Sequence, residues 1–128
     1  MKAVGYTRSL PIDDPDSLTD IEQEQPVATG RDLLVKVNAI AVNPVDYKIR
    51  QRTAAADGEY KVIGWDAVGE VVATGEQATQ FKSGDMVFYA GDLKRQGCNA
   101  EYQLVDERIV GLKPKSLSDA EAAALPLT

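Results

Sequence analysis

Histidine and cysteine, two side chains typical of metal sites, are scarce in this sequence. There is no histidine among the 128 residues, and Cys98 is the one cysteine. Acid–base chemistry by histidine is therefore excluded, and a zinc site is nearly so, because zinc prefers several sulfur and nitrogen ligands. A disulfide within the chain is excluded too, so we expect a protein of a reducing, cytoplasmic compartment.

Long apolar runs and an excess of positive charge are also missing. No apolar stretch approaches the ~18 residues that a membrane span needs, and the N-terminus is too polar for a signal peptide. The 14 basic and 20 acidic side chains leave a net charge of −6, which argues against nucleic acid and membrane partners. With 44% hydrophobic residues, the chain can instead build one domain with its own core.

Short alternating segments between glycine and proline turns predict a mainly β chain. The most regular is 32–42, where Leu33, Val35 and Val37 continue into two alanines on one face. Helices occur only as insertions, which predicts a small, partly open β-barrel or a β-rich α+β domain. The expected strands are 2–7, 18–24, 32–42, 68–74, 86–90, 98–105 and 108–110, with a mobile loop at 91–97.

The segment 43–50 (NPVDYKIR) predicts the start of a short helix. Asn43 fits the N-cap, Pro44 the first helical position, and Asp46 an acceptor beside the positive helix end. Arg50 lies one turn after Asp46 and is expected to pair with it. In the alternative interpretation, the amides and polar side chains of this helix start face a ligand cleft.

A second helix is predicted from the capping box Ser118–Glu121 and is expected to end near Pro126. Its apolar surface, Ala122–Leu125, has no obvious partner in the sequence. We therefore expect residues 1–128 to be a fragment of a longer protein.

The remaining chemistry-bearing residues have simple structural interpretations. Cys98 is expected to be a small buried side chain, with a reactive thiol as the alternative. The acidic residues of 13–16 predict a solvated turn rather than a cation site. Segment 64–75 (GWDAVGEVVATG) lacks the GxGxxG pattern, so its glycines are expected to mark a bulge, a close backbone approach and a turn.

The order of several segments resembles a known family. They are 32–37 (DLLVKV), 43–46 (NPVD), 64–71 (GWDAVGEV), 81–87 (FKSGDMV), 100–102 (AEY) and 122–126 (AAALP). Together they resemble the N-terminal, GroES-like catalytic domain of the medium-chain dehydrogenases/reductases, in the zinc-free quinone oxidoreductase-like branch. The resemblance covers essentially all of 1–128 and implies that an NAD(P)-binding Rossmann domain follows residue 128.

Two departures from the family pattern bear on the chemistry. Zinc-dependent members carry an early catalytic cysteine and a Gly-His-Glu motif, where this chain has Asn43 and Gly64-Trp65-Asp66. The resemblance therefore implies chemistry without zinc. Zinc-free members often have a tyrosine two residues after the motif aspartate, where this chain has Lys48, with Tyr47 just before it.

The resemblance implies that the complete protein reduces a quinone or an α,β-unsaturated carbonyl with hydride from NADPH, and that 1–128 alone is inactive. The candidate donors to the substrate oxygen are Tyr47, Lys48 and Arg50. By family position, the residues expected to border the cofactor are Asn43, Pro44, Asp46 and Thr128.

Small molecules are the expected partners, and a homodimer is compatible with this interpretation. Two alternatives remain open. One is a stand-alone GroES-like interaction module of the co-chaperonin type, although such a module has no need of a capped, alanine-rich helix. The other is a non-enzymatic member that binds nucleotide as a sensor.

Overall fold

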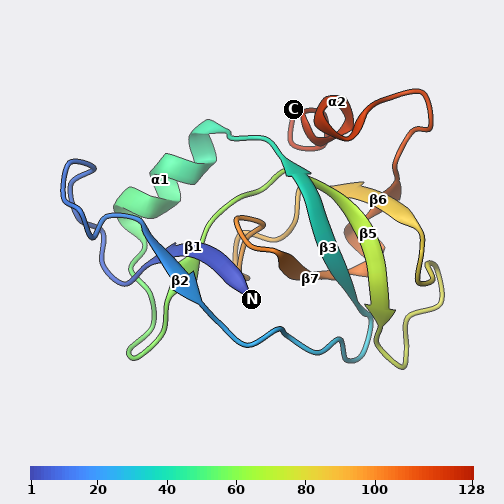
Figure 1. Ribbon diagram of the computed structural model, residues 1–128, viewed down its shortest axis with the longest axis horizontal. Helices are drawn as coiled ribbons and strands as arrows, with labels where there is room; N and C mark the ends of the chain where they lie inside the picture. The colour runs from blue at the N-terminus through green and yellow to red at the C-terminus, as the bar shows by residue number, and fades with distance from the viewer.

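The computed structural model describes residues 1–128 and consists of two antiparallel sheets with two short helices (Figure 1). One sheet has the strand order β2-β1-β4 and the other the order β7-β3-β5-β6-β8. The strands are β1 (Lys2–Tyr6), β2 (Thr19–Glu22), β3 (Asp32–Ile40), β4 (Lys61–Val62), β5 (Ala67–Thr74), β6 (Met86–Tyr89), β7 (Tyr102–Asp106) and β8 (Gly111–Leu112). The helices are α1 (Pro44–Arg52) and α2 (Asp119–Ala123), with a 3₁₀ turn, η1, at Glu107–Ile109. The sheets do not close on each other, which confirms the prediction of a mainly β, partly open fold.

Strand β3 lies near the centre of the larger sheet, between β7 and β5. Its predicted apolar face is buried at Leu33 and Val35, which belong to the main hydrophobic cluster. Gly69 lies opposite, where a Cβ would stand 2.3 Å from the Lys36 carbonyl oxygen. The register between β3 and β5 shifts beside this glycine, so the predicted bulge and close backbone approach are both confirmed.

Helix α2 covers the opposite face of the same sheet. Ala122 and Ala123 have no exposed surface and pack against Val68. The predicted capping box is present, with Ser118 Oγ accepting a hydrogen bond from the Glu121 backbone N–H at 3.2 Å. Half of the apolar segment 122–125 thus has a partner within the chain, whereas Ala124 and Leu125 are exposed as expected, and the helix ends at Ala123, earlier than predicted.

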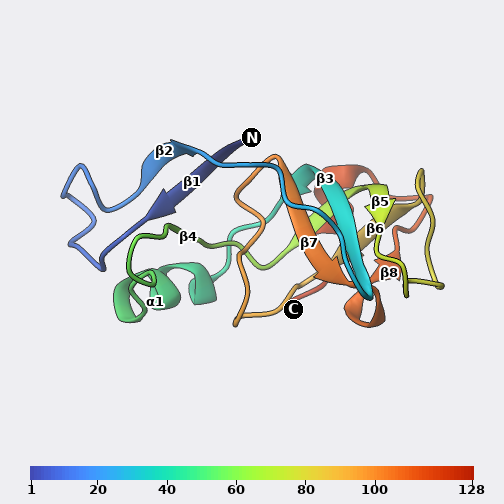
Figure 2. The same cartoon turned by 90° about the horizontal axis from the view of Figure 1, so that it is seen from below.

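Helix α1 packs beside the smaller sheet, on the side of β4 (Figure 2). Tyr6, Ile63 and Trp65 form a buried cluster against which Val45 and Ile49 of the helix pack. Neither α1 nor α2 is long and apolar enough to cross a membrane.

The segment 98–112 differs most from the prediction. The strand expected over 98–105 begins only at Tyr102, and the strand expected over 108–110 is replaced by η1 followed by β8. Asp106 accepts a hydrogen bond from the Arg108 backbone N–H at 2.9 Å, which caps the turn and bends the chain. The two-residue strand β4 was not predicted, because so short a segment shows no alternation.

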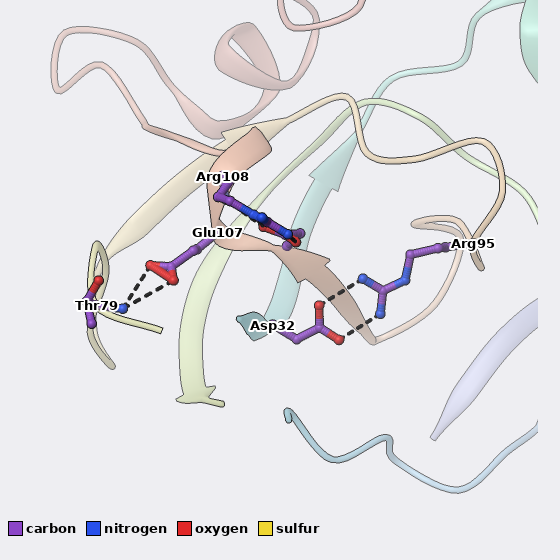
Figure 3. Close-up of polar contacts among 6 residues, drawn as sticks. Asp32, Thr79, Arg95, Glu107 and Arg108 are labelled. Carbon is purple, nitrogen blue, oxygen red and sulfur yellow. Dashed lines mark hydrogen bonds and ion pairs between the residues drawn. The ribbon is translucent and has the colours of Figure 1, made fainter. Parts of the chain in front are cut away.

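Near the first residue of β3, charged side chains form a cluster in which each charge is compensated by an ion pair or by hydrogen bonds (Figure 3). Asp32 accepts two hydrogen bonds from Arg95, at 2.8 and 2.7 Å, so the loop expected to be mobile at 91–97 is tied to the sheet. Glu107 is fully buried and accepts from the backbone N–H groups of Thr79 at 2.9 Å and Gln80 at 2.7 Å. These contacts link the loops at this end of the sheet.

Candidate functional site

The predicted site residues lie at the other end of β3, where the chain leaves Ile40 and enters α1. The start of β5 is beside them, because Ile40 pairs with Ala67. The end of the chain returns to the start of β5, because the Leu127 backbone N–H donates to the Asp66 carboxylate at 2.8 Å. Three segments that are far apart in the sequence therefore meet at this position.

The start of α1 has the predicted cap residues. Asn43 is the N-cap with an extended backbone, and Pro44 is the first helical residue. The Asp46 carboxylate accepts a hydrogen bond from the Asn43 backbone N–H at 2.7 Å, as the prediction of an acceptor required. The Asn43 side chain makes a contact that was not predicted, since its Nδ2 donates to Asp66 Oδ2 at 2.8 Å.

Asp66 joins the three segments. Its side chain is about 1% exposed and forms no ion pair. Its Oδ1 accepts from the Leu127 backbone N–H at 2.8 Å, while Oδ2 accepts from Asn43. Its backbone carbonyl accepts from the Ala41 N–H at 3.1 Å. No role was predicted for Asp66, although an acidic residue within the apolar stretch 62–68 is a signal of a buried carboxylate.

Burial dominates the electrostatics of the neighbouring titratable groups. Burial raises the pKa of Asp46, and the nearby Asp66 raises it further, while backbone hydrogen bonds oppose the shift. Burial also raises the pKa of the Cys98 thiol to about 11, and its Sγ donates to the Asp66 carbonyl at 3.4 Å. Cys98 is therefore the small, protonated, buried side chain that was predicted, not the reactive thiol.

The predicted pairing of Arg50 with Asp46 is wrong. Arg50 is about 4% exposed, and its Nη1 donates to the Leu10 carbonyl at 2.6 Å. The pairing fails because Asp46 already accepts from Asn43, whereas the 9–12 segment offers the guanidinium a carbonyl oxygen. Arg50 and Tyr47 share the wall of a cavity of about 430 Å³ with this segment.

The other predicted residues lie at the surface. The Tyr47 side chain is about 51% exposed. Lys48, Pro44 and Thr128 are exposed, and Lys48 forms no ion pair. The structure therefore groups Asn43 and Asp46 with Asp66, and leaves the donor groups of Tyr47 and Lys48 accessible on the adjoining helix.

The polar side chains of this site are placed as hydrogen-bonding groups, not as a set of metal ligands. No group of three or more acidic or cysteine side chains is placed to hold a metal. The Asn43 carbonyl oxygen, the Tyr47 hydroxyl and the Lys48 ammonium offer hydrogen-bonding groups that suit a nicotinamide riboside. The chain has no glycine-rich loop for the phosphates.

Comparisons with known proteins connect this chain to one family. The model of the alcohol dehydrogenase GroES-like domain matches residues 29–115. A zinc-type alcohol dehydrogenase-like protein of Staphylococcus epidermidis is 43% identical over 128 residues, which are 100% of this chain and 38% of that protein. A 2-methylene-furan-3-one reductase of Solanum lycopersicum is 39% identical over 142 residues, covering 99% of this chain and 34% of that protein. The chain thus spans little more than a third of the length of these relatives.

Solved structures agree with this assignment. A protein of the zinc-dependent alcohol dehydrogenase type from Rhizobium etli is 59% identical, with a TM-score of 0.95 over 99% of this chain and 37% of that one. The quinone oxidoreductase of Coxiella burnetii is 28% identical, with a TM-score of 0.86 over 98% and 41%. A mycobacterial protein complexed with NADPH is 27% identical, with a TM-score of 0.82 over 97% and 37%. The chain belongs to the alcohol dehydrogenase GroES-like domain family of the medium-chain dehydrogenases/reductases.

Proposed function

We propose that the complete protein reduces quinones or α,β-unsaturated carbonyls by hydride transfer from NADPH, without zinc. In this proposal, residues 1–128 form the substrate-side domain and an NAD(P)-binding Rossmann domain follows residue 128. The proposal is supported by the oxidoreductase names of the relatives, including a quinone oxidoreductase and a furanone reductase. The NADPH complex of the mycobacterial neighbour supports the choice of cofactor.

The side chains at the end of β3 support the absence of zinc from the reaction. Zinc prefers several sulfur and nitrogen ligands, whereas residues 1–128 contain one cysteine, Cys98, and no histidine. Asn43 and Trp65 stand where zinc-dependent members have cysteine and histidine. Because several relatives carry zinc in their names, the experiment below tests the metal separately.

The observation that carries the proposal is the pair of exposed donors next to a buried polar network. Hydride addition to a conjugated carbonyl leaves negative charge on the substrate oxygen, and a hydrogen-bond donor beside that oxygen lowers the barrier. NADPH supplies the hydride when it is bound. Tyr47 and Lys48 offer accessible hydroxyl and ammonium donors, whereas Arg50 already donates to Leu10.

The residues proposed to border the nicotinamide are those of the helix start and the chain end. Asn43 and Asp46 are held in place by hydrogen bonds of the cap, so their positions do not depend on the ligand. Pro44 and Thr128 are exposed. These residues orient the ring, and none of them is required to donate a proton.

The test is an assay of NADPH consumption by the complete protein. We expect turnover with a quinone and with an enone, and unchanged rates after dialysis against a chelator. A simple alcohol with NADP⁺ serves as the control substrate and should not react. Oxidation of simple alcohols that disappears on chelation would contradict the proposal, and binding of NADPH without turnover of either acceptor would favour the sensor alternative.

A further inference from the structure

We propose that Asp66 is the positioning residue of this site. It holds Asn43 so that this side chain offers a ligand only its carbonyl oxygen, and it couples that orientation to the chain at Leu127. The identity of the ligand as a nicotinamide nucleotide rests on the proposed function. The orientation of Asn43 rests on contacts within this chain alone.

The carboxylate of Asp66 determines which end of the Asn43 amide faces inward. A carboxylate only accepts hydrogen bonds, so the group that lies 2.8 Å from Asp66 Oδ2 is the amide nitrogen. The same nitrogen also reaches the Ala41 carbonyl oxygen at 3.5 Å. Both amide hydrogens are thus directed at the protein, and Oδ1, which faces the Asp46 backbone N–H in the capping box, keeps one acceptor position for a ligand.

The arrangement is held rigidly because Asp66 is buried. A carboxylate that is about 1% exposed and forms no ion pair depends on its hydrogen bonds for compensation. Those bonds come from Asn43, 23 residues away, and from the Leu127 backbone, 61 residues away. Losing either contact leaves buried charge less compensated, so the helix start and the end of the chain are held together.

The polarity of Asn43 restricts what it can recognise. An amide oxygen accepts hydrogen bonds, so the group that it meets on a ligand is a donor. In a nicotinamide nucleotide the donors are the ribose hydroxyls and the carboxamide N–H₂. Phosphate and carbonyl oxygens are excluded as partners of Asn43, because they only accept.

The experiment compares NADPH dissociation constants of the complete protein and its variants. In Asp66→Asn the new amide can donate to Asn43, which turns the Asn43 amide around and presents its N–H₂ to the ligand. We expect the dissociation constant to rise about tenfold, the value of one hydrogen bond. The double variant Asn43→Asp/Asp66→Asn exchanges donor and acceptor, presents an oxygen again, and should bind NADPH like the wild type.

Glu107→Gln is the matched control. It neutralises another fully buried carboxylate that forms no ion pair, at the opposite end of β3. We expect its NADPH dissociation constant to be unchanged. A purely structural role for Asp66 would weaken binding equally in the single and double variants, so rescue by the double variant is the distinguishing result.

Hydrogen exchange at the Leu127 amide gives a readout that does not require NADPH. Protection should be lost in Asp66→Ala and kept in Asp66→Asn, which retains an acceptor oxygen. Unchanged NADPH binding in Asp66→Asn would overturn the inference, and so would failure of the double variant to restore binding. If Asp66→Asn does not fold, NADPH binding by the double variant alone decides whether the inference holds. If the wild type itself does not bind NADPH, the proposed function fails, whereas the positioning role is still overturned by unchanged Leu127 protection in Asp66→Ala.

Discussion

Charged side chains gather at both ends of β3, but they are compensated differently. At the Asp32 end, Arg95 pairs with Asp32 at 2.7 Å, and Glu107 accepts from the Thr79 backbone N–H (Figure 3) and from that of Gln80. At the Ile40 end, Asp66 and Arg50 are buried without an ion pair, and Arg50 donates to a single carbonyl. We call the first end closed, because it contains the Asp32–Arg95 ion pair, and the second end open, because it has no ion pair and carries the exposed donors Tyr47 and Lys48.

The difference separates scaffold from site. Both ends bury a carboxylate that forms no ion pair, Glu107 at the closed end and Asp66 at the open end, so buried charge alone does not distinguish them. The closed end ties loops to the sheet. The open end places Tyr47 and Lys48 next to the Asn43–Asp66 pair. Substitutions at the closed end should therefore affect stability, and substitutions of exposed donors at the open end should affect activity.

The largest effect is expected from Glu107→Ala. This change leaves the buried amides of Thr79 and Gln80 without an acceptor, which should lower the free energy of unfolding by about 3 to 4 kcal/mol. Urea denaturation measures the loss. The folded fraction should bind NADPH normally, and a loss below about 1 kcal/mol would show that this end is not the scaffold.

Tyr47→Phe tests whether a donor at the open end affects activity and not stability. Its hydroxyl forms no hydrogen bond within the chain, so the free energy of unfolding should not change, whereas kcat with an enone should fall about 100-fold. Tyr60→Phe is the matched control, because Tyr60 is also partly exposed and lies outside the site. Equal kinetics of the two variants would remove Tyr47 from the proposed mechanism.

Cys98 should make stability depend on pH in the alkaline range. The thiol ionises near pH 9.0 in an unfolded chain and near 11 in the folded one. Between these values only the unfolded state has released its proton, so the free energy of unfolding falls as pH rises, by about 2 to 3 kcal/mol at pH 11. Denaturation of the wild type and Cys98→Ala at pH 8 to 11 isolates this contribution, and parallel curves would contradict it.

Asp32→Asn should give the smallest effect. The Asp32–Arg95 pair has two good hydrogen bonds, but the Arg95 side chain is about 37% exposed, so solvent screens the attraction. We expect a loss of about 1 kcal/mol that shrinks at high salt. Asp13→Asn, at an exposed residue without an ion pair, is the control. A loss that does not respond to salt would point to packing rather than charge.

Features set by neighbouring residues could be predicted from the sequence. The alternation of 32–42 predicted β3, and the cap residues Asn43 and Ser118 predicted both helix starts, because these signals act over a few residues. The same locality explains the wrong pairing of Arg50 with Asp46. Spacing on a helix shows which side chains can meet, but it does not show that Leu10 approaches the guanidinium from another segment.

The centre of the candidate site could not be predicted, because its contacts are distant in the sequence. Asp66 binds partners 23 and 61 residues away, and Glu107 binds partners 27 and 28 residues away. No periodicity encodes such contacts. Only the presence of a carboxylate in an apolar segment indicates that hydrogen-bond donors have to be gathered around it.

The most direct test of the difference between the two ends of β3 compares Lys48→Met with Arg95→Met in the complete protein. Each removes one positive charge, the first at the open end and the second at the closed end of β3. We predict that Lys48→Met lowers kcat/KM for an enone by about 100-fold with an unchanged Tm, and that Arg95→Met lowers Tm with unchanged kcat/KM. Equal losses of kcat/KM in both variants, or full activity of Lys48→Met, would contradict the account.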